Sequence, residues 1–104
     1  MKLLEITVAI GIKAFMRPSL LVRMVDSIKL NLPNVKIYIA DDSDPNKRDE
    51  VFYKMIEGEG HVVIRLPFDS GISVGRNAIV EKVKESYLLM CDDDFEITPD
   101  NGVM

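Results

Sequence analysis

Apolar residues in this chain form four short runs, each of a length that suits a single β-strand. The first, at residues 6–12, is nearly continuous in apolar character, which is typical of a strand buried on both faces of a sheet. The last ends in Cys91, and we expect this cysteine to be a small core residue of a buried strand. The runs predict strands at residues 6–12, 35–40, 61–67 and 87–91.

Two stretches between these runs carry apolar residues at the spacing of an amphipathic helix. Pro18 suits the first turn of a helix that ends near Leu32, because a first-turn residue needs no partner for its N–H. Asp44 and Pro45 predict the cap and the first position of one continuous helix, which Gly58 stops.

A third helix is expected to begin beside Gly71, with Ser70 or Ser73 as its cap, and to run to about Ser86. Its predicted packed face consists of Val74, Ala78, Ile79 and Val83. Strands and helices therefore alternate, which predicts an α/β fold with a mainly parallel, Rossmann-like sheet and helices on both faces. We interpret residues 1–104 as a single domain that looks truncated, with an open sheet edge available for self-association.

Charge and cysteine content limit the partners and the location of the chain. Its 104 residues carry a formal net charge of −4, which disfavours nucleic acid or an anionic membrane as a partner. No apolar run is long enough to span a bilayer. Cys91 is the only cysteine, so an intramolecular disulfide is excluded and we expect a cytoplasmic protein. His61, the only histidine, follows a glycine at a strand start, and we expect it at the surface.

Acidic residues gather where the predicted strands end. Asp41 and Asp42 follow the second strand, and an aspartate triplet at residues 92–94 follows the fourth. Because the carboxyl ends of parallel strands meet at one edge of a sheet, we expect these acids to share a crevice with Arg76 and the loop at residues 13–17. The triplet is either a solvated loop tip or a site for a hard divalent cation such as Mg²⁺ or Mn²⁺. A phosphate-bearing ligand would explain why both signs of charge occur there.

Other phosphate-binding folds fit the sequence less well. There is no Gly-x-x-x-x-Gly-Lys-Ser/Thr run, and the Gly71-x-x-x-Gly75 spacing lacks the Gly-x-Gly-x-x-Gly turn of dinucleotide-binding folds. A receiver-type phosphoacceptor domain would carry paired acids directly after the first strand, where this chain has Lys13, Ala14 and Phe15. A nucleotidyltransferase would show a glycine-rich, basic loop near its start, and Gly11 alone is a weak match.

Four motifs stand in order on the predicted elements. Residues 12–18 (Ile-Lys-Ala-Phe-Met-Arg-Pro) follow the first strand, and residues 39–43 (Ile-Ala-Asp-Asp-Ser) end the second. Residues 69–77 hold Asp-x-Gly-x-x-x-Gly-Arg-Asn, and residues 90–95 hold Met-Cys-Asp-Asp-Asp-Phe. Over the whole chain this set resembles the amino-terminal, nucleotide-binding half of GT-A glycosyltransferases, most similar to family 2. The departures from that family's usual residues are Lys13, Met16, Asp69 and Gly75. The first of these replaces a residue that lies close to the nucleotide base in the family.

The resemblance implies a nucleotide-diphospho-sugar transferase fold that binds a nucleotide-diphosphate sugar, with a UDP-sugar favoured. By this similarity the loop after the first strand contributes Ala14, Phe15 and Arg17 to the site. Asp42 matches the acid that contacts the base in the family, and Arg76 matches a residue that supports the nucleotide.

The aspartate triplet resembles the Asp-x-Asp motif of the family. Asp92 would then face the ribose or sugar phosphate and join Asp94 in binding Mn²⁺ or Mg²⁺, while Asp93 contacts the sugar. The implied reaction is displacement at the anomeric carbon, with the metal and Arg76 stabilising the leaving diphosphate.

The resemblance assigns no catalytic base to this chain. In inverting members of the family, the carboxylate that deprotonates the acceptor comes from the second half of the enzyme, and we expect that half to lie outside these 104 residues. The acceptor is likewise unassigned. The alternative to a glycosyltransferase is a non-catalytic nucleotide- or metal-binding module, such as a degenerate remnant.

Overall fold

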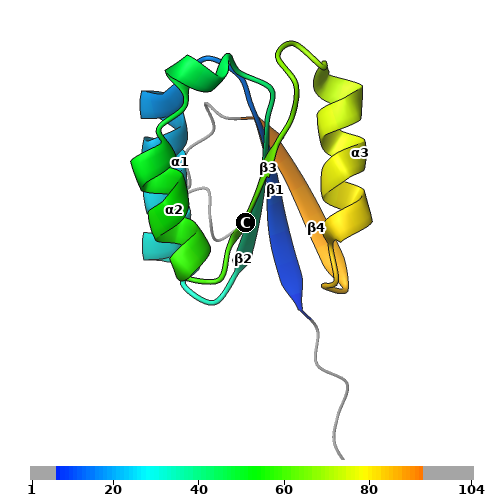
Figure 1. The fold of residues 1–104 in the computed structure, drawn as a ribbon. Helices are drawn as coiled ribbons and strands as arrows, with labels where there is room; N and C mark the ends of the chain where they lie inside the picture. Colours follow the sequence, from blue (N-terminus) through cyan, green and yellow to red (C-terminus); the bar gives the residue numbers. More distant parts are fainter. Residues whose placement is uncertain (1–6, 93–104) are drawn as a thin grey trace, which may run out of the picture.

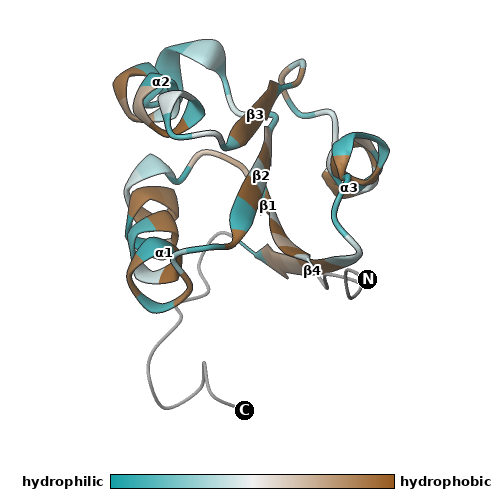
Figure 2. Ribbon diagram, turned by 90° about the horizontal axis from the view of Figure 1, so that it is seen from below, coloured by the Kyte–Doolittle hydropathy of each residue, from teal (hydrophilic) through white to brown (hydrophobic). Residues whose placement is uncertain are grey.

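Parallel strands in the order β3-β2-β1-β4 form the central sheet in a computed structural model, which describes residues 7–92 (Figure 1). The strands are β1 (Val8–Ala14), β2 (Lys36–Asp41), β3 (Val62–Arg65) and β4 (Tyr87–Asp92). The helices are α1 (Pro18–Asn31), a 3-10 helix (Pro45–Lys47), α2 (Glu50–Gly58) and α3 (Ile72–Lys82). Helices α1 and α2 cover one face and α3 covers the other, as Figure 2 shows from below. The predicted class, a parallel α/β sheet with helices on both faces, is confirmed.

The register of the sheet brings three strand ends together. Ala14 of β1 pairs with Asp41 of β2, and Lys13 pairs with Asp92 of β4. Since all these pairs are parallel, the carboxyl ends of β1, β2 and β4 lie at one edge of the sheet.

Two apolar cores lie on the two faces of the sheet, because successive side chains of a strand point to opposite faces. Ile37 and Ile39 belong to the core under α1 and α2, whereas Tyr38 and Ala40 belong to the core under α3. The first core is the larger, and α1 contributes four buried side chains to it: Leu21, Met24, Val25 and Ile28. Burial of each such side chain stabilises the fold by about 1.5–3 kcal/mol.

Helix α3 packs on the sheet at Gly11 of β1. A Cβ built on Gly11 would lie 2.7 Å from the Met90 sulfur and 2.9 Å from a methyl carbon of Ile79, which is fully buried. Both distances are below any normal contact, so the absence of a side chain at this position permits the close approach of α3.

The helix predicted to start at Asp44 and Pro45 is in fact two elements. Asp44 caps the 3-10 helix by accepting a hydrogen bond from the N–H of Asn46 (2.9 Å), and Asp49 caps α2 through the N–H of Phe52 (3.0 Å). Between them Arg48 is extended, with φ −83° and ψ 143°. Its guanidinium donates to three carbonyl oxygens, those of Asp41 (3.2 Å), Ser43 (2.9 Å) and Leu66 (2.6 Å). The prediction of one continuous helix was wrong because Arg48 links loop carbonyls instead of continuing the helix.

The start of α3 also differs from the prediction. Neither serine caps it: Gly71 occupies the cap position with φ +98°, and the Ser70 hydroxyl donates to the Pro67 carbonyl (2.6 Å). Val74, expected on the packed face, is exposed, whereas Gly75 is buried. The helix ends at Lys82 rather than near Ser86.

Strand β4 lies at the edge of the sheet as described, and it pairs only with β1 within residues 7–92. Tyr87 and Leu89 are exposed, so the prediction of a fully buried strand was wrong. Cys91 is half-buried against the first core, and burial raises the pKa of its thiol, as expected for a packing residue. No helix among residues 7–92 is long and apolar enough to cross a membrane.

Candidate functional site

A cleft of about 400 Å³ lies at the carboxyl ends of β1, β2 and β4. Its walls come from the loop after β1, the end of β2, the segment that leads into α3, and the tip of β4. The lining residues are Lys13, Phe15, Arg17, Asp42, Asp69, Gly71, Ile72 and Asp92. The edge of the sheet that the sequence predicted for the site therefore carries a cleft.

Asp42 lies directly after β2, at the base of this cleft, and its side chain is only 2% exposed. One carboxylate oxygen forms an ion pair with the Lys13 ammonium, and the other accepts the N–H of Gly71 at 2.9 Å. Burial acts to raise the pKa of Asp42, but the hydrogen bonds from Lys13 and Gly71 outweigh it and hold the pKa below its ordinary value. Asp42 is therefore a buried anion with both oxygens engaged.

Lys13 reaches Asp42 from β1, and its side chain is 8% exposed. The ammonium also donates to the Ala14 carbonyl at 3.4 Å and lies 5.8 Å from the centre of the Phe15 ring. The aliphatic part of Lys13 lies against Gly75 of α3, where an added Cβ would overlap its Cδ and lie 2.5 Å from its Cε. Two departures from the family pattern, Lys13 and Gly75, thus form one contact.

The Phe15 ring forms part of the wall after β1. Phe15 stacks on Phe68, with ring centres 5.8 Å apart and planes 27° apart. The next residue, Met16, donates its N–H to the Ser43 hydroxyl oxygen at 2.6 Å and so ties this loop to the end of β2. Arg17 lines the same side of the cleft. A flat apolar surface therefore lies beside the buried Lys13 and Asp42 pair.

Asp92, which lines the cleft at the tip of β4, and Arg76, which lies beside it on α3, form an exposed rim. The Asp92 side chain is 71% exposed and that of Arg76 is 49% exposed, and their charged groups are 3.9 Å apart. Exposed pairs of this kind contribute little to stability, so a ligand can replace either partner at low cost. Within residues 7–92, no group of three or more His, Cys, Asp or Glu side chains could hold a metal ion.

Asp41, predicted to share the crevice with Asp42, faces the other side of the sheet, because neighbouring residues of a strand point to opposite faces. Its carboxylate accepts the Ser43 N–H at 2.7 Å and the Tyr53 hydroxyl, and lies 3.9 Å from Nε of Arg48. Burial, and then the bond to Asp41, raises the pKa of Tyr53, so the phenol stays a donor. Placing Asp41 in the crevice was therefore wrong.

The structure brings together most of the described residues that the sequence predicted for the site. Phe15, Arg17, Asp42 and Asp92 line the cleft, and Arg76 lies beside it through Asp92. The side chain of Ala14 is buried in the core under α1 and α2, and its carbonyl contacts this group by accepting from the Lys13 ammonium and from the N–H of Asp42, each at 3.4 Å. The predicted residues Asp93 and Asp94 lie outside the described residues.

The sequence prediction omitted the cleft residues of the segment before α3. Asp69 has φ +57° and donates its N–H to the Asp42 carbonyl at 2.8 Å, which ties this segment to the end of β2. Gly71 then reaches the Asp42 carboxylate with φ +98°, and Ile72 lines the cleft beside it. The Asp69-x-Gly71 pattern was a usable signal, because Asp and Gly are the residues that tolerate positive φ.

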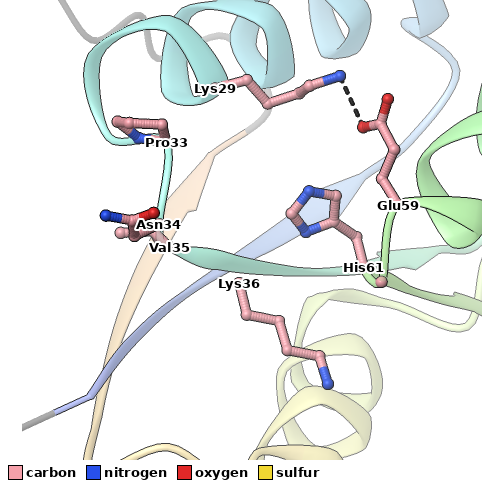
Figure 3. Close-up of a pocket in the computed structure, with 8 residues that line it drawn as sticks. Lys29, Pro33, Asn34, Val35, Lys36, Glu59 and His61 are labelled. Carbon is pink, nitrogen blue, oxygen red and sulfur yellow. Dashed lines mark ion pairs between the residues drawn. The ribbon is translucent and has the colours of Figure 1, made fainter.

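A second cleft, of about 480 Å³, lies at the other end of the sheet (Figure 3). Two of its charged residues, Lys29 and Glu59, form an ion pair at 2.7 Å. His61, expected at the surface, is half-buried there, and its Nδ1 accepts the N–H of Ile37 at 3.0 Å. Burial lowers the pKa of His61, which keeps the imidazole neutral as this acceptor. His61 therefore ties the segment before β3 to the start of β2, and the Lys29–Glu59 pair ties α1 to the end of α2.

Comparison with known protein families assigns the chain to one family. Residues 9–101 match the family described as glycosyl transferase family 2. The chain belongs to this family. Its parallel sheet, with a cleft at the strand ends, is the GT-A fold of that family, as the sequence resemblance implied.

A human relative, beta-1,4 N-acetylgalactosaminyltransferase 1, is 36% identical over 91 residues, which are 88% of this chain. This chain covers only 16% of that relative. The mouse beta-1,4 N-acetylgalactosaminyltransferase 2 is 32% identical over 89 residues. That match covers 85% of this chain and 16% of the relative. This family 2 chain thus spans about one sixth of the length of both relatives.

Among solved structures, the crystal structure of S. aureus TarS residues 1–349 matches with a TM-score of 0.76 and 13% sequence identity. The match covers 92% of this chain and 30% of TarS 1–349. At that identity the similarity concerns the fold alone, and it agrees with the family assignment.

Proposed function

We propose that this chain is the donor-binding part of a glycosyltransferase, and that its cleft binds a nucleotide-diphosphate sugar, with a UDP-sugar favoured, through a divalent cation. The observation that carries the proposal is the composition of the cleft. The aromatic ring of Phe15, the buried carboxylate of Asp42 and an exposed Asp92–Arg76 pair lie together at the carboxyl ends of the strands. Family 2 membership supports it, as does the fold shared with TarS 1–349, whose crystal structure in complex with UDP-GlcNAc matches with a TM-score of 0.71.

The nucleoside would occupy the inner part of the cleft. Phe15 offers a ring against which a base can stack, and its stacking on Phe68 holds that ring in place. Lys13 and Asp42 lie at the base of the cleft and provide the polar groups that can read the edge of the base. An apolar surface with a few convergent polar groups is the usual form of a small-molecule site.

The diphosphate would lie at the outer rim. Arg76 carries the planar guanidinium that binds phosphate oxygens through paired hydrogen bonds. The exposed carboxylate of Asp92 supplies oxygen ligands of the type that Mn²⁺ and Mg²⁺ prefer, with Asp94 as the proposed second ligand. When bound, the cation would neutralise charge on the departing diphosphate. Asp93 is proposed to contact the sugar.

Isothermal titration of UDP into the full chain, with and without Mn²⁺, tests this proposal. We expect UDP to bind with Mn²⁺ present and to bind at least about tenfold more weakly without it, since charge-assisted contacts of this kind are worth about 1.5–3 kcal/mol. Asp92→Ala should weaken binding by a similar factor in Mn²⁺ and remove the dependence on Mn²⁺.

Asp26→Ala is the matched control, because Asp26 is an exposed aspartate of α1 that does not line the cleft. It should bind UDP as the wild type does. If neither UDP nor any other nucleoside diphosphate binds in the presence of Mn²⁺, the proposal is wrong.

A donor-hydrolysis assay separates the glycosyltransferase from a non-catalytic module. Slow release of UDP from a UDP-sugar by this chain, with water in place of the acceptor, would indicate a competent reaction centre. Binding without any such release would favour the non-catalytic module.

A cytoplasmic location, organisation as a single domain, and self-association through the edge of the sheet at β4 stay predictions. Analytical ultracentrifugation tests the self-association.

A further inference from the structure

The Lys13 and Asp42 pair differs from an ordinary charged pair at the rim of a cleft. Both side chains are almost fully enclosed, at 8% and 2% exposure, although both residues line the cleft. Asp42 already uses one carboxylate oxygen on Lys13 and the other on the N–H of Gly71. The acid therefore offers little of its surface to a ligand.

Lys13 retains what Asp42 lacks, a hydrogen-bonding group still available to a ligand. An ammonium has three N–H donors, and within residues 7–92 this one has two acceptors, the Asp42 carboxylate and the Ala14 carbonyl, so a third donor can serve a ligand. It also lies 5.8 Å from the centre of the Phe15 ring, so a base stacked on that ring comes within reach of the ammonium.

The charge balance favours a base over a phosphate as the target of Lys13. The adjacent buried carboxylate of Asp42 neutralises the positive charge of Lys13, so the pair attracts a diphosphate only weakly. Arg76, exposed at the rim, is better placed to bind phosphate oxygens. What Lys13 supplies is a donor held in a defined direction.

Gly75 allows Lys13 to occupy this position. The lysine stem fills the space that a Cβ at residue 75 would require, so α3 and β1 hold the stem from both sides. A side chain confined in this way loses little further freedom when a ligand binds, which favours selective recognition.

We infer that Lys13 is the residue that selects the base in this cleft, by donating a hydrogen bond to the carbonyl oxygen at position 4 of uracil, and that Asp42 is a positioning residue that orients the ammonium. This inference rests on the proposed binding of a nucleotide diphosphate. Uracil carries a carbonyl at position 4, where cytosine carries an amino group that cannot accept a hydrogen bond. A site built to donate to a carbonyl rejects an analogue that lacks it, because its own polar group is then left unpaired.

Titration of UDP and CDP in Mn²⁺ into the full chain and into Lys13→Met tests the inference. Methionine keeps much of the apolar stem and removes the donor. We expect the wild type to bind UDP about ten- to hundredfold more tightly than CDP, as the strength of a charge-assisted hydrogen bond implies. Lys13→Met should lose this preference by weakening UDP and leaving CDP unchanged.

Because Lys13→Met leaves the Asp42 carboxylate buried without its ion-pair partner, the double variant Lys13→Met/Asp42→Asn is measured as well. It carries no buried charge at the pair, and it should fold and show the same loss of preference. Asp42→Asn alone should keep most of the preference for UDP, since Lys13 is still present. Lys36→Met, at the other end of β2, is the matched control and should bind both nucleotides as the wild type does.

The outcomes separate this inference from the function on which it rests. If neither nucleotide binds the wild type in Mn²⁺, the proposed function itself fails. If UDP binds but Lys13→Met weakens UDP and CDP equally, Lys13 acts on the phosphates and the inference is overturned. It is also overturned if Lys13→Met keeps the preference for UDP while Asp42→Asn loses it, because Asp42 would then be the residue that reads the base.

Discussion

Asp41 and Asp42 are neighbours in the chain and are almost equally buried, yet they belong to two different regions of the molecule. Asp41 lies on the side of α1 and α2, where Ser43, Tyr53 and Arg48 surround its carboxylate. Asp42 lies on the side of α3 and lines the cleft.

The difference shows that burial of an acid does not by itself mark a binding site. The network of Asp41 consists of groups that stabilise the loop after β2, including the Arg48 guanidinium that also holds three carbonyl oxygens. The partners of Asp42 are a lysine and a glycine N–H that both line the same cleft. Whether the hydrogen-bond partners of a buried acid line a cleft therefore distinguishes a structural acid from an acid of a binding site.

The largest expected effect is that of Asp41→Ala on stability. The substitution leaves the Tyr53 hydroxyl and the Ser43 N–H without their shared acceptor, and it removes the carboxylate that lies 3.9 Å from Nε of the buried Arg48. The free energy of unfolding should therefore fall by about 3 kcal/mol. Urea unfolding measures this, with Asp26→Ala as a control that should change stability by less than about 0.5 kcal/mol. A more than tenfold loss of UDP affinity in the folded Asp41→Ala protein would contradict the separation of the two acids.

A smaller effect is expected from Gly75→Ala, which acts on the cleft side alone. The new methyl group overlaps the Lys13 stem and should displace its ammonium, reducing the preference for UDP over CDP by about tenfold. Stability should stay within about 1 kcal/mol, because the better helix propensity of alanine offsets the crowding.

Gly58→Ala is the matched control for this substitution, since a Cβ there has no atom within 4 Å. It should leave the binding of both nucleotides unchanged. Equal preferences for UDP in Gly75→Ala and in the wild type would show that the Lys13 stem adapts without moving its donor.

The smallest effect concerns the pH dependence of stability. The pKa of Asp42 lies below its ordinary value of 3.8 in the folded protein, so its contribution to stability is fully present above that value and is lost as the pH falls through the lowered pKa. Comparison of urea unfolding between pH 6 and pH 3 for the wild type and Asp42→Asn should show a steeper decline in the wild type. For one proton the extra slope is at most about 1.4 kcal/mol per pH unit. Parallel curves would mean that Lys13 does not stabilise the Asp42 anion.

Much of the fold could be predicted from the sequence, because apolar runs and helical spacing are local signals. They gave the alternation of strands and helices, and the rule for parallel strand ends then placed Phe15, Asp42 and Asp92 at one edge. The position of β4 at the edge was not predictable in this way. A run such as Tyr87 to Cys91 has the same composition whether one or two strands flank it.

The contacts that give the cleft its character depend on tertiary structure. Nothing in the local sequence shows that Lys13 and Gly75 meet, since they come from different elements that the sheet and α3 bring together. Arg48 breaks a helix for a similar reason, because its carbonyl partners include Leu66, which is distant in the chain. The opposite directions of Asp41 and Asp42, by contrast, follow from simple strand alternation once the end of β2 is known.

Gly11 lies away from the cleft, but it affects the relative positions of Arg76 and Asp92 at the rim. The gap between α3 and β1 is as narrow as it is because this position has no side chain, and α3 carries Arg76 while β1 is paired with the strand that carries Asp92. A methyl group at residue 11 would push α3 away from the sheet. It would therefore change the distance between the charged groups of Arg76 and Asp92. The distance between the charges of Arg76 and Asp92 therefore depends on Gly11 carrying a hydrogen atom in place of a side chain.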